Sequence, residues 1–495
     1  MQASPIQTSM SVRRHAQDAY FIRVASSYSK SGLPISTPVK PSLGQSSITH
    51  TGAAPSSSVS TISEPLPLPA GSLASLKSSL SILPLSCIVR SLLITSISSY
   101  PRLLDSSLAL LNLVTRTKLA ILDADRNPII KYVLGRTVYD QFCAGETPAQ
   151  INRTIQNLRD RGFAGAVLGY AKEVVLADDE AVGMNSLVTK TGETTRDIME
   201  INTWKNNQIK TINLAGRGNV VNVKWTGAGS LTLERMLKEI REYRSSSTQS
   251  NKRFKTRLTH GQLISCAMDR PGLPVIVYNT YQAYLRSVPS TVAKHLHLAE
   301  TEGWVLGVKL VRGAYLNSDP RHLIWATKEE TNRSYDGVAE ALITQSYNDV
   351  VQPIASKNES GTTSSFGSGG STSFPEVNLV LASHNRDSVL KARTLRNKQM
   401  QNGEKMIRMA YGQLYGMADD ISCALIHGDS NTQAQAEAGL KVEKPRVFKA
   451  VIWGNMQDCA EYLLRRGHEN RDAASRTADT RNAMAAELRR RVFRL

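Results

Sequence analysis

The strongest constraint on the fold is a series of seven short apolar runs between residues 162 and 454. Each run is almost continuously apolar over four to six residues, and stretches with helical spacing separate them. Strands buried on both faces have this pattern, and their alternation with helices is typical of a parallel sheet covered by helices. The runs are 162–171, 219–227, 273–281, 304–313, 377–385, 406–416 and 446–454, and the clearest intervening helices are 231–244 and 290–303.

Two parallel folds fit this alternation. A (β/α)8 barrel needs eight strands, and the widest gap between runs, 245–272, contains no segment that looks like a buried strand. A doubly wound open sheet is the alternative, but TGAGSL at 226–231 does not complete the G-x-G-x-x-G motif of that fold. We therefore expect an α/β chain that forms a (β/α)8 barrel with one barrel strand missing.

The regions outside these runs have their own signatures. Residues 1–75 are rich in serine, threonine and proline, contain arginines and few acids, and are predicted to be a disordered mitochondrial targeting segment. A helical region is expected at 76–160. Its most apolar tract, 82–98, is interrupted by Arg90 and is too short to span a bilayer, so we expect a buried or membrane-surface helix. The Gly/Ser-rich segment 356–375 is predicted to be a flexible insertion.

The net charge of +18 admits nucleic acid, an anionic membrane or anionic ligands as partners. No nucleic-acid-binding motif or basic-aromatic tract is present, so no nucleic-acid partner is expected. The five cysteines contain no CxxC pair, which argues against a disulfide framework and against structural zinc.

The ends of the predicted strands carry most of the candidate chemistry, because function in a parallel barrel gathers at the carboxyl ends of its strands. Cations and amides dominate there and carboxylates are nearly absent, which favours an anionic or carbonyl-rich ligand over a metal. No Ser-His-Asp set or acid pair for hydrolysis is evident. The residues are Lys224, Asn279, Tyr281, Lys309, Arg312, Tyr315, Ser383, His384, Asn385, Gln413 and Tyr415.

A predicted helix near the end of the chain, EYLLRRGHENR at 461–471, contains the adjacent pair Arg465 and Arg466. Two guanidinium forks on one helix can bind a planar carboxylate through parallel N–H bonds, which lysine cannot reproduce. Glu469 lies four residues after Arg465 and three after Arg466, where it can hold both. A solvated helix face is the alternative interpretation of the pair.

Five motifs in order along the chain resemble mitochondrial proline dehydrogenase. They are VYNTYQAYL (277–285), VKLVRGAY (308–315), ASHN (382–385), YGQLYGMADDIS (411–422) and YLLRRGHEN (462–470); QFCAGET (141–147) and ATKEETNRSYDG (326–337) fit as well. The resemblance covers roughly residues 85–495. It implies that 161–495 form a distorted (β/α)8 barrel that holds FAD, with a C-terminal helix over the substrate.

The resemblance also implies the activity. L-Proline would be oxidised to Δ1-pyrroline-5-carboxylate by hydride transfer to the flavin, and the electrons would pass to ubiquinone at the inner mitochondrial membrane, on the matrix side. Arg465 and Arg466 would bind the proline carboxylate, with Glu469 holding them. Lys224 would lie near that carboxylate, and Tyr315 would pack by the proline ring.

The remaining roles implied by the resemblance concern the cofactor. Lys309 would lie beside the flavin N5 edge, and Val311, Arg312, Gly313 and Ala314 would form the flavin-binding loop. Lys328 and Thr331 would bind the phosphate and adenosine part. Ala382, Ser383, His384 and Asn385 would face FAD, Asn279 and Gln413 would contact the isoalloxazine edge, and Leu414 or Tyr415 would close over the substrate.

Two departures from the family pattern leave other interpretations open. The D-A-E motif of the third barrel strand is missing, and Ala450 replaces the usual tyrosine. The chain could therefore be a catalytically impaired homologue with weak or no flavin binding, or the product of a gene model that lost a segment. Another flavin-barrel reductase, such as a methylenetetrahydrofolate reductase, and a purely lipid-binding role are further alternatives.

Overall fold

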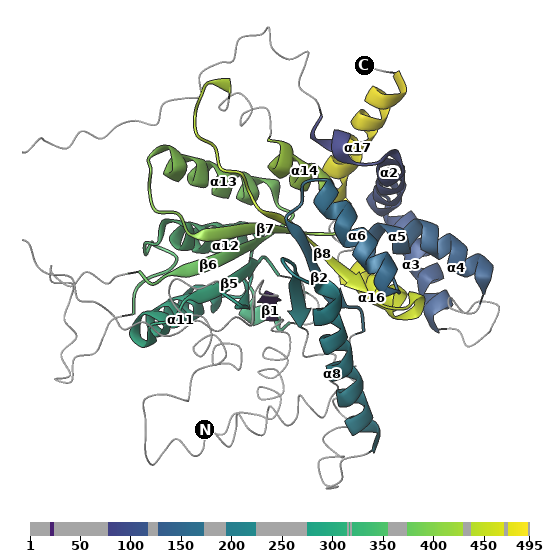
Figure 1. Ribbon diagram of the computed structural model, residues 1–495, viewed down its shortest axis with the longest axis horizontal. Helices are drawn as coiled ribbons and strands as arrows, with labels where there is room; N and C mark the ends of the chain where they lie inside the picture. The colour runs from purple at the N-terminus through teal and green to yellow at the C-terminus, as the bar shows by residue number, and fades with distance from the viewer. Residues whose placement is uncertain are drawn as a thin grey trace, which may run out of the picture. The chain divides into compact units, whose positions relative to one another are not determined.

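The computed structural model describes residues 20–23, 78–116, 127–172, 195–223, 275–313, 316, 319–354, 374–428, 437–469 and 474–493 (Figure 1). The chain divides into two units, one made of residues 1–25 and 78–495 and the other of residues 26–77. All of the described residues belong to the first unit.

A closed barrel forms the centre of this unit, and all seven predicted strands are present in it. The strands are β1 Tyr20–Arg23, β2 Gly165–Tyr170, β3 Val220–Val223, β4 Val277–Gln282, β5 Leu306–Val311, β6 Val377–Ala382, β7 Arg408–Leu414 and β8 Val447–Trp453. Their order around the barrel is β1-β3-β2-β8-β7-β6-β5-β4. Strands β2 to β8 are parallel wherever they pair with one another.

The eighth position of the barrel is filled from an unexpected part of the chain. β1 pairs antiparallel with β3 over four residues and with β4 over two, so it closes the gap between these strands. No parallel strand occupies this gap among the described residues, in agreement with the predicted missing strand. β1 lies within 1–75, which we expected to be disordered, and the predicted helix 231–244 and the segment 245–272 lie outside the described residues.

Helices surround the barrel, and an additional helical layer precedes it (Figure 1). The helices are η1 Ser79–Ile82, α2 Leu85–Ser99, α3 Pro101–Arg116, α4 Pro128–Leu134, η2 Gly135–Tyr139, α5 Asp140–Phe142, α6 Pro148–Asp160, α8 Thr195–Ala215, α11 Val288–Glu302, η4 Arg321–Leu323, α12 Lys328–Thr344, α13 Arg386–Gln401, α14 Asp419–His427, α16 Met456–Glu469 and α17 Ala474–Phe493. The helical region predicted before the barrel is thus present. The predicted insertion lies outside the described residues up to residue 373.

Local sequence explains where several helices begin and end. The helices α6 and α12 both start with a capping box, in which Thr147 and Gln150, or Thr327 and Glu330, satisfy each other's backbone N–H groups. Asn385 caps α13 by accepting a hydrogen bond from the Ser388 amide. The caps of α12 and α13 begin these helices after the loops that follow β5 and β6, whereas the cap of α6 begins the helix that precedes β2.

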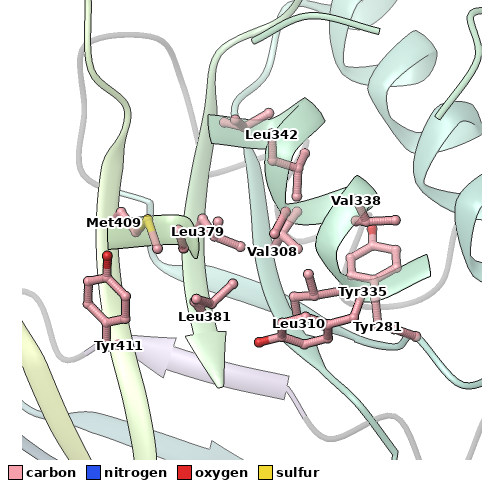
Figure 2. Close-up of a cluster of buried hydrophobic side chains, with 14 of the residues drawn as sticks. Tyr281, Val308, Leu310, Tyr335, Val338, Leu342, Leu379, Leu381, Met409 and Tyr411 are labelled. Atoms are coloured by element: carbon pink, nitrogen blue, oxygen red, sulfur yellow. The ribbon is translucent and has the colours of Figure 1, made fainter. Parts of the chain in front are cut away.

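The core has two layers, one inside the barrel and one between the barrel and its helices. Val167, Val220, Tyr278, Val380, Ala410 and Phe448 form the inner cluster. The outer layer is larger. Figure 2 shows part of it, where α12 contributes Tyr335, Val338 and Leu342 and the strands contribute Val308, Leu310, Leu379, Leu381, Met409 and Tyr411. Because side chains alternate along a strand, membership in one layer tells which way each strand residue points.

The last helix of the chain packs on the N-terminal helical layer. Met484 of α17 is buried with Leu80, Leu83 and Ile88. The Nη2 atom of Arg491 donates to the carbonyls of Leu80, Ser81 and Leu83. Burial alone would raise the pKa of Glu487, but hydrogen bonds from Arg490 and Arg491 lower it to about 2. None of the described helices is both long and apolar enough to cross a membrane.

Candidate active site

The inner face of the barrel near its strand ends defines the candidate site. On each strand, the residue two positions after the member of the inner cluster also points inward, because side chains alternate along a strand. These residues are Gly169, Asn222, Thr280, Ala382, Gly412 and Ala450. Lys309 belongs to the same face, since it pairs in register with Thr280 on one side and Val380 on the other. Both of its strand neighbours, Val308 and Leu310, are buried in the outer layer.

This face has one half made of small residues and one half made of polar residues. Ala382, Gly412, Ala450 and Gly169 come from β6, β7, β8 and β2, and a Cβ placed on Gly412 would meet the Ala382 Cβ at 3.7 Å. Opposite them, β3, β4 and β5 contribute Asn222, Thr280, Gln282 and Lys309. The inner face thus combines a half with small side chains and a half that carries a cation and amides.

The loop after β5 is held by contacts to two helices. Nη1 of Arg312 donates to Ser388 Oγ at 3.0 Å, and its guanidinium lies 5.2 Å from the centre of the Tyr335 ring. Ser388 in turn donates to Asp336 at 2.6 Å. Gly313 adopts a φ of +148° against Tyr284, where an added Cβ would lie 2.4 Å from the ring. Only glycine fits at this position without a shift of the tyrosine.

The triplet after β6 is fixed by its own hydrogen bonds. Ser383 is buried, its amide donates to the Gly412 carbonyl at 3.2 Å, and its Oγ accepts from the Asn385 amide at 3.0 Å. The Leu414 amide donates to Nε2 of His384 at 3.0 Å. The structure therefore brings this triplet together with Gly412 and Leu414 at the ends of β6 and β7.

The first turn of α12 carries Lys328 and Thr331. Lys328 is exposed, and Thr331 is half-buried with its hydroxyl bonded to the Thr327 carbonyl at 3.2 Å. A helix N-terminus attracts anions. Glu329 and Glu330 lie in the same turn, where a hydrogen bond from the Thr327 backbone amide lowers the pKa of Glu330.

The arginine pair lies on α16, which begins three residues after β8 ends. Cys459 of this helix is buried with Ala171 and Ile452, which lie at the mouth-side ends of β2 and β8, and Tyr462 and Leu463 pack against them. Arg465 and Arg466 are only partly exposed, and Nε of each is buried. The Arg466 guanidinium lies 5.3 Å from the centre of the Tyr462 ring. The pair is thus not in bulk solvent, whereas the side chain of Glu469, the last residue of α16, lies outside the described part.

Four predicted site residues, Asn279, Tyr281, Gln413 and Tyr415, lie on the outer side of the barrel wall, and Tyr281 there bonds His295 of α11. Asn279 alternates with the inward Tyr278 and is buried toward the helices. Gln413 is also buried, and its Oε1 accepts from Ser422 of α14 at 3.1 Å. Tyr415 lines a small cavity with Arg90, Arg161, Phe163 and Lys449, and burial raises its pKa to about 12. Leu414 differs from them, because it is partly exposed and shares the inner face with Ala450.

Lys224, Ala314 and Tyr315 lie outside the described residues. Conversely, the inner face contains Gln282 and Asn222, which the sequence analysis did not select. Oδ1 of Asn222 is buried and lacks a hydrogen-bond partner among the described atoms. The strict alternation of β4 around Tyr278 could have identified Gln282 in place of Asn279.

Comparisons with known proteins identify related sequences and similar structures. The family model described as proline dehydrogenase matches residues 151–479. A Schizosaccharomyces pombe protein named probable mitochondrial proline dehydrogenase is 27% identical over 461 residues, with 82% of this chain and 88% of that protein covered. A hydroxyproline dehydrogenase of Xenopus laevis is 28% identical over 48% of this chain and 43% of its own length. A proline utilization A structure from Bdellovibrio bacteriovorus aligns with 16% identity and a TM-score of 0.43, over 78% of this chain and 38% of that one.

Proposed function

This chain belongs to the proline dehydrogenase family, and from that premise we propose that it oxidises L-proline to Δ1-pyrroline-5-carboxylate with FAD held at the barrel mouth. The electrons pass to ubiquinone, and the enzyme works on the matrix side of the inner mitochondrial membrane. The observation that carries the proposal is the partly buried pair Arg465 and Arg466 on the helix that packs against the mouth-side ends of β2 and β8.

The arginine pair is suited to a small amino acid. A carboxylate accepts two parallel hydrogen bonds from a guanidinium group, and the bonds are strong because both partners are charged. The aromatic face of Tyr462 and the buried part of α16 restrict how Arg466 can move. Two such groups in a partly desolvated position fix the carboxylate, and with it the orientation of the ring carbon that reacts.

The residue types on the inner face of the barrel support the proposed flavin. Ala382, Gly412 and Ala450 form a wall low enough for a flat ring, and Lys309, Gln282 and Asn222 provide a cation and amides beside it. The buried Oδ1 of Asn222 calls for a hydrogen-bond donor. FAD, when bound, would supply the acceptor for a hydride from proline, and this hydride carries both electrons of the oxidation. Lys309 would stabilise negative charge on the reduced ring, and Gly313 and His384 belong to the loops that would hold the cofactor.

The residues of the site act by binding and positioning. Proline must react with its nitrogen as the free amine, and no carboxylate or neutral base among the described inner-face residues is placed to remove that proton. We therefore assign no general base. The arginines orient the carboxylate, and Leu414 at the rim helps to exclude water.

The N-terminal helical layer supports association with a membrane surface. Exposed apolar side chains gather on three successive helices, in contrast to an ordinary soluble surface. They are Leu85, Val89 and Leu93 on α2, Leu103, Leu110 and Leu113 on α3, and Ile129, Tyr132 and Val133 on α4. The net charge of +18 favours anionic lipid. An enzyme held at the bilayer has direct access to ubiquinone.

An anaerobic absorbance spectrum tests the activity and the cofactor together. We expect the purified protein to show a flavin band that bleaches on addition of L-proline, and trans-4-hydroxy-L-proline serves as the competing substrate. Bleaching with hydroxyproline alone would reassign the substrate. A colourless protein that does not take up added FAD would contradict the proposal.

Two observations favour a second candidate, an impaired homologue. Ala450 on the inner face lacks the hydroxyl that the family places there, and β1 fills a barrel position in the opposite direction to its neighbours. A protein that binds FAD but does not bleach with either amino acid would support this candidate.

A further inference from the structure

A fully buried lysine behind the barrel wall holds the turn that follows β7. Only 1% of the Lys449 side chain is exposed, and its Nζ lies 2.7 Å from Asp419 Oδ1. The same nitrogen donates to the Met417 carbonyl at 2.8 Å and to the Leu414 carbonyl at 3.4 Å. One ammonium group therefore ties both ends of the turn 414–417 to β8.

The turn is constrained from other directions as well. The Met417 amide donates to the Leu414 carbonyl at 3.2 Å, and the Tyr415 amide donates to the Ala450 carbonyl at 2.8 Å. Gly416 has a φ of +73°, and an added Cβ would lie 2.1 Å from the Gln141 carbonyl. Ala418 also has a positive φ, of 49°. Such a backbone is strained and persists only when its surroundings determine it.

The turn positions Leu414, whose amide makes a hydrogen bond that determines where His384 carries its proton. The Leu414 amide donates to Nε2 of His384 at 3.0 Å. An amide nitrogen cannot accept a hydrogen bond, so Nε2 must carry a lone pair, and in a neutral imidazole the proton then resides on Nδ1. The geometry selects one of the two tautomers of His384.

We propose that Lys449 and Asp419 are positioning residues that, through the turn after β7, hold His384 as its Nδ1-protonated tautomer. The ring then presents a hydrogen-bond donor at Nδ1. This tautomer follows from the hydrogen bond to Nε2 and does not depend on the proposed function.

The tautomer can be read by long-range nitrogen–proton NMR on protein labelled at the imidazole nitrogens. The chain has nine histidines, and the His384→Asn variant identifies the signal of His384. We expect a protonated Nδ1 and an unprotonated Nε2 in the wild-type protein. An Nε2-protonated ring, or a doubly protonated ring at neutral pH, would overturn the tautomer assignment. The measurement needs no activity and gives the same reading whether or not the protein binds FAD.

Two pairs of variants separate the donor from its support. Leu414→Pro removes the amide proton while Leu414→Ala keeps it, so only the proline variant should reduce the preference for the Nδ1 form, by roughly fivefold for one lost hydrogen bond. An unchanged preference in a folded Leu414→Pro protein contradicts the role of this amide.

The support is tested with both charges of the buried pair removed. Lys449→Met with Asp419→Asn leaves no unpaired charge behind, and Lys444→Met is the matched control at an exposed lysine. We expect the double variant to lower the tautomer preference about two- to fivefold, within the range for one weakened hydrogen bond. Circular dichroism checks that it folds. A folded double variant with the wild-type preference would refute the positioning role. If the double variant does not fold, Asp419→Asn alone tests the carboxylate, and a wild-type preference in that folded variant would refute the role of Asp419.

Discussion

Tyr281 of β4 and His295 of α11 are joined by a hydrogen bond of 2.6 Å between Tyr281 Oη and His295 Nδ1. Both residues are buried, and their rings meet edge to face with centres 5.6 Å apart. The bond connects the barrel wall to its outer helix just below Gln282, so it bears on how firmly the polar half of the site is held.

The burial of His295 makes the stability of the protein depend on pH. Burial, with a smaller contribution from Lys294, lowers the pKa of His295 from 6.5 to about 4. As pH falls below 6.5, the unfolded chain takes up a proton that the folded chain refuses, so the free energy of unfolding should fall by up to about 3 kcal/mol by pH 4. Above pH 6.5 both states are neutral and the effect vanishes. Denaturant unfolding of wild type and His295→Gln at several pH values measures the difference, and His297→Gln, on the same helix, should behave as wild type.

The arginine pair should govern affinity for the substrate. Arg465→Lys and Arg466→Lys keep the charge but lose the planar fork, so each should raise the KM for L-proline roughly 10- to 100-fold, the equivalent of one charge-assisted hydrogen bond. Flavin absorbance should be retained. Arg489→Lys on the exposed face of α17 is the control. A normal KM in both variants would show that the pair lies on a solvated helix face and does not bind the substrate.

Gly313 should tolerate no side chain. In Gly313→Ala the new Cβ meets the Tyr284 ring. We expect overpacking to lower the free energy of unfolding by about 1–3 kcal/mol and to weaken the retention of FAD. Gly403→Ala is a matched control, because Gly403 also has a positive φ of +67° but no atom within 4 Å of the new Cβ. The Gly403→Ala variant should lose only about 1–2 kcal/mol of unfolding free energy, from backbone strain. Equal effects in the two variants would mean that strain, not the contact with Tyr284, explains the glycine.

Ala450 is the position at which a gain of activity is expected. Ala450→Tyr places a hydroxyl on the inner face, and one new hydrogen bond to the substrate should raise kcat/KM for L-proline by about fivefold. Ala450→Phe fills the same space without the hydroxyl and should give no gain. If phenylalanine raises kcat/KM as much as tyrosine, packing and not hydrogen bonding limits this site.

The strand β1 should contribute to barrel stability. Removal of residues 1–24 leaves the facing edges of β3 and β4 without their antiparallel partner, whereas removal of residues 1–19 keeps Tyr20–Arg23. We expect the longer deletion to unfold at lower denaturant concentration and to aggregate, because unpaired strand edges recruit other chains. Identical unfolding curves for the two deletions would show that β1 does not support the barrel.

The strands of the barrel could be predicted because they are buried on both faces, and a continuous apolar run has few other uses in a chain of this kind. The helix that contains Arg465 and Arg466 could be predicted from the helical pattern after the last strand, whereas the role of the pair stays a prediction. The assignments of Asn279 and Tyr415 depended on which face each residue shows, and a shift of one residue reverses that face.

By itself the sequence determined the number and order of the parallel strands, the helical layer before them and the residue types near the site, because burial and local hydrogen bonding act over a few neighbouring residues. Only the tertiary structure decided that β1 closes the barrel, that Gln282 and not Asn279 faces inward, and that Lys449 reaches Asp419 and the turn after β7. These contacts join segments that lie far apart in the chain, and they depend on register and on the direction of each strand, which no local pattern specifies.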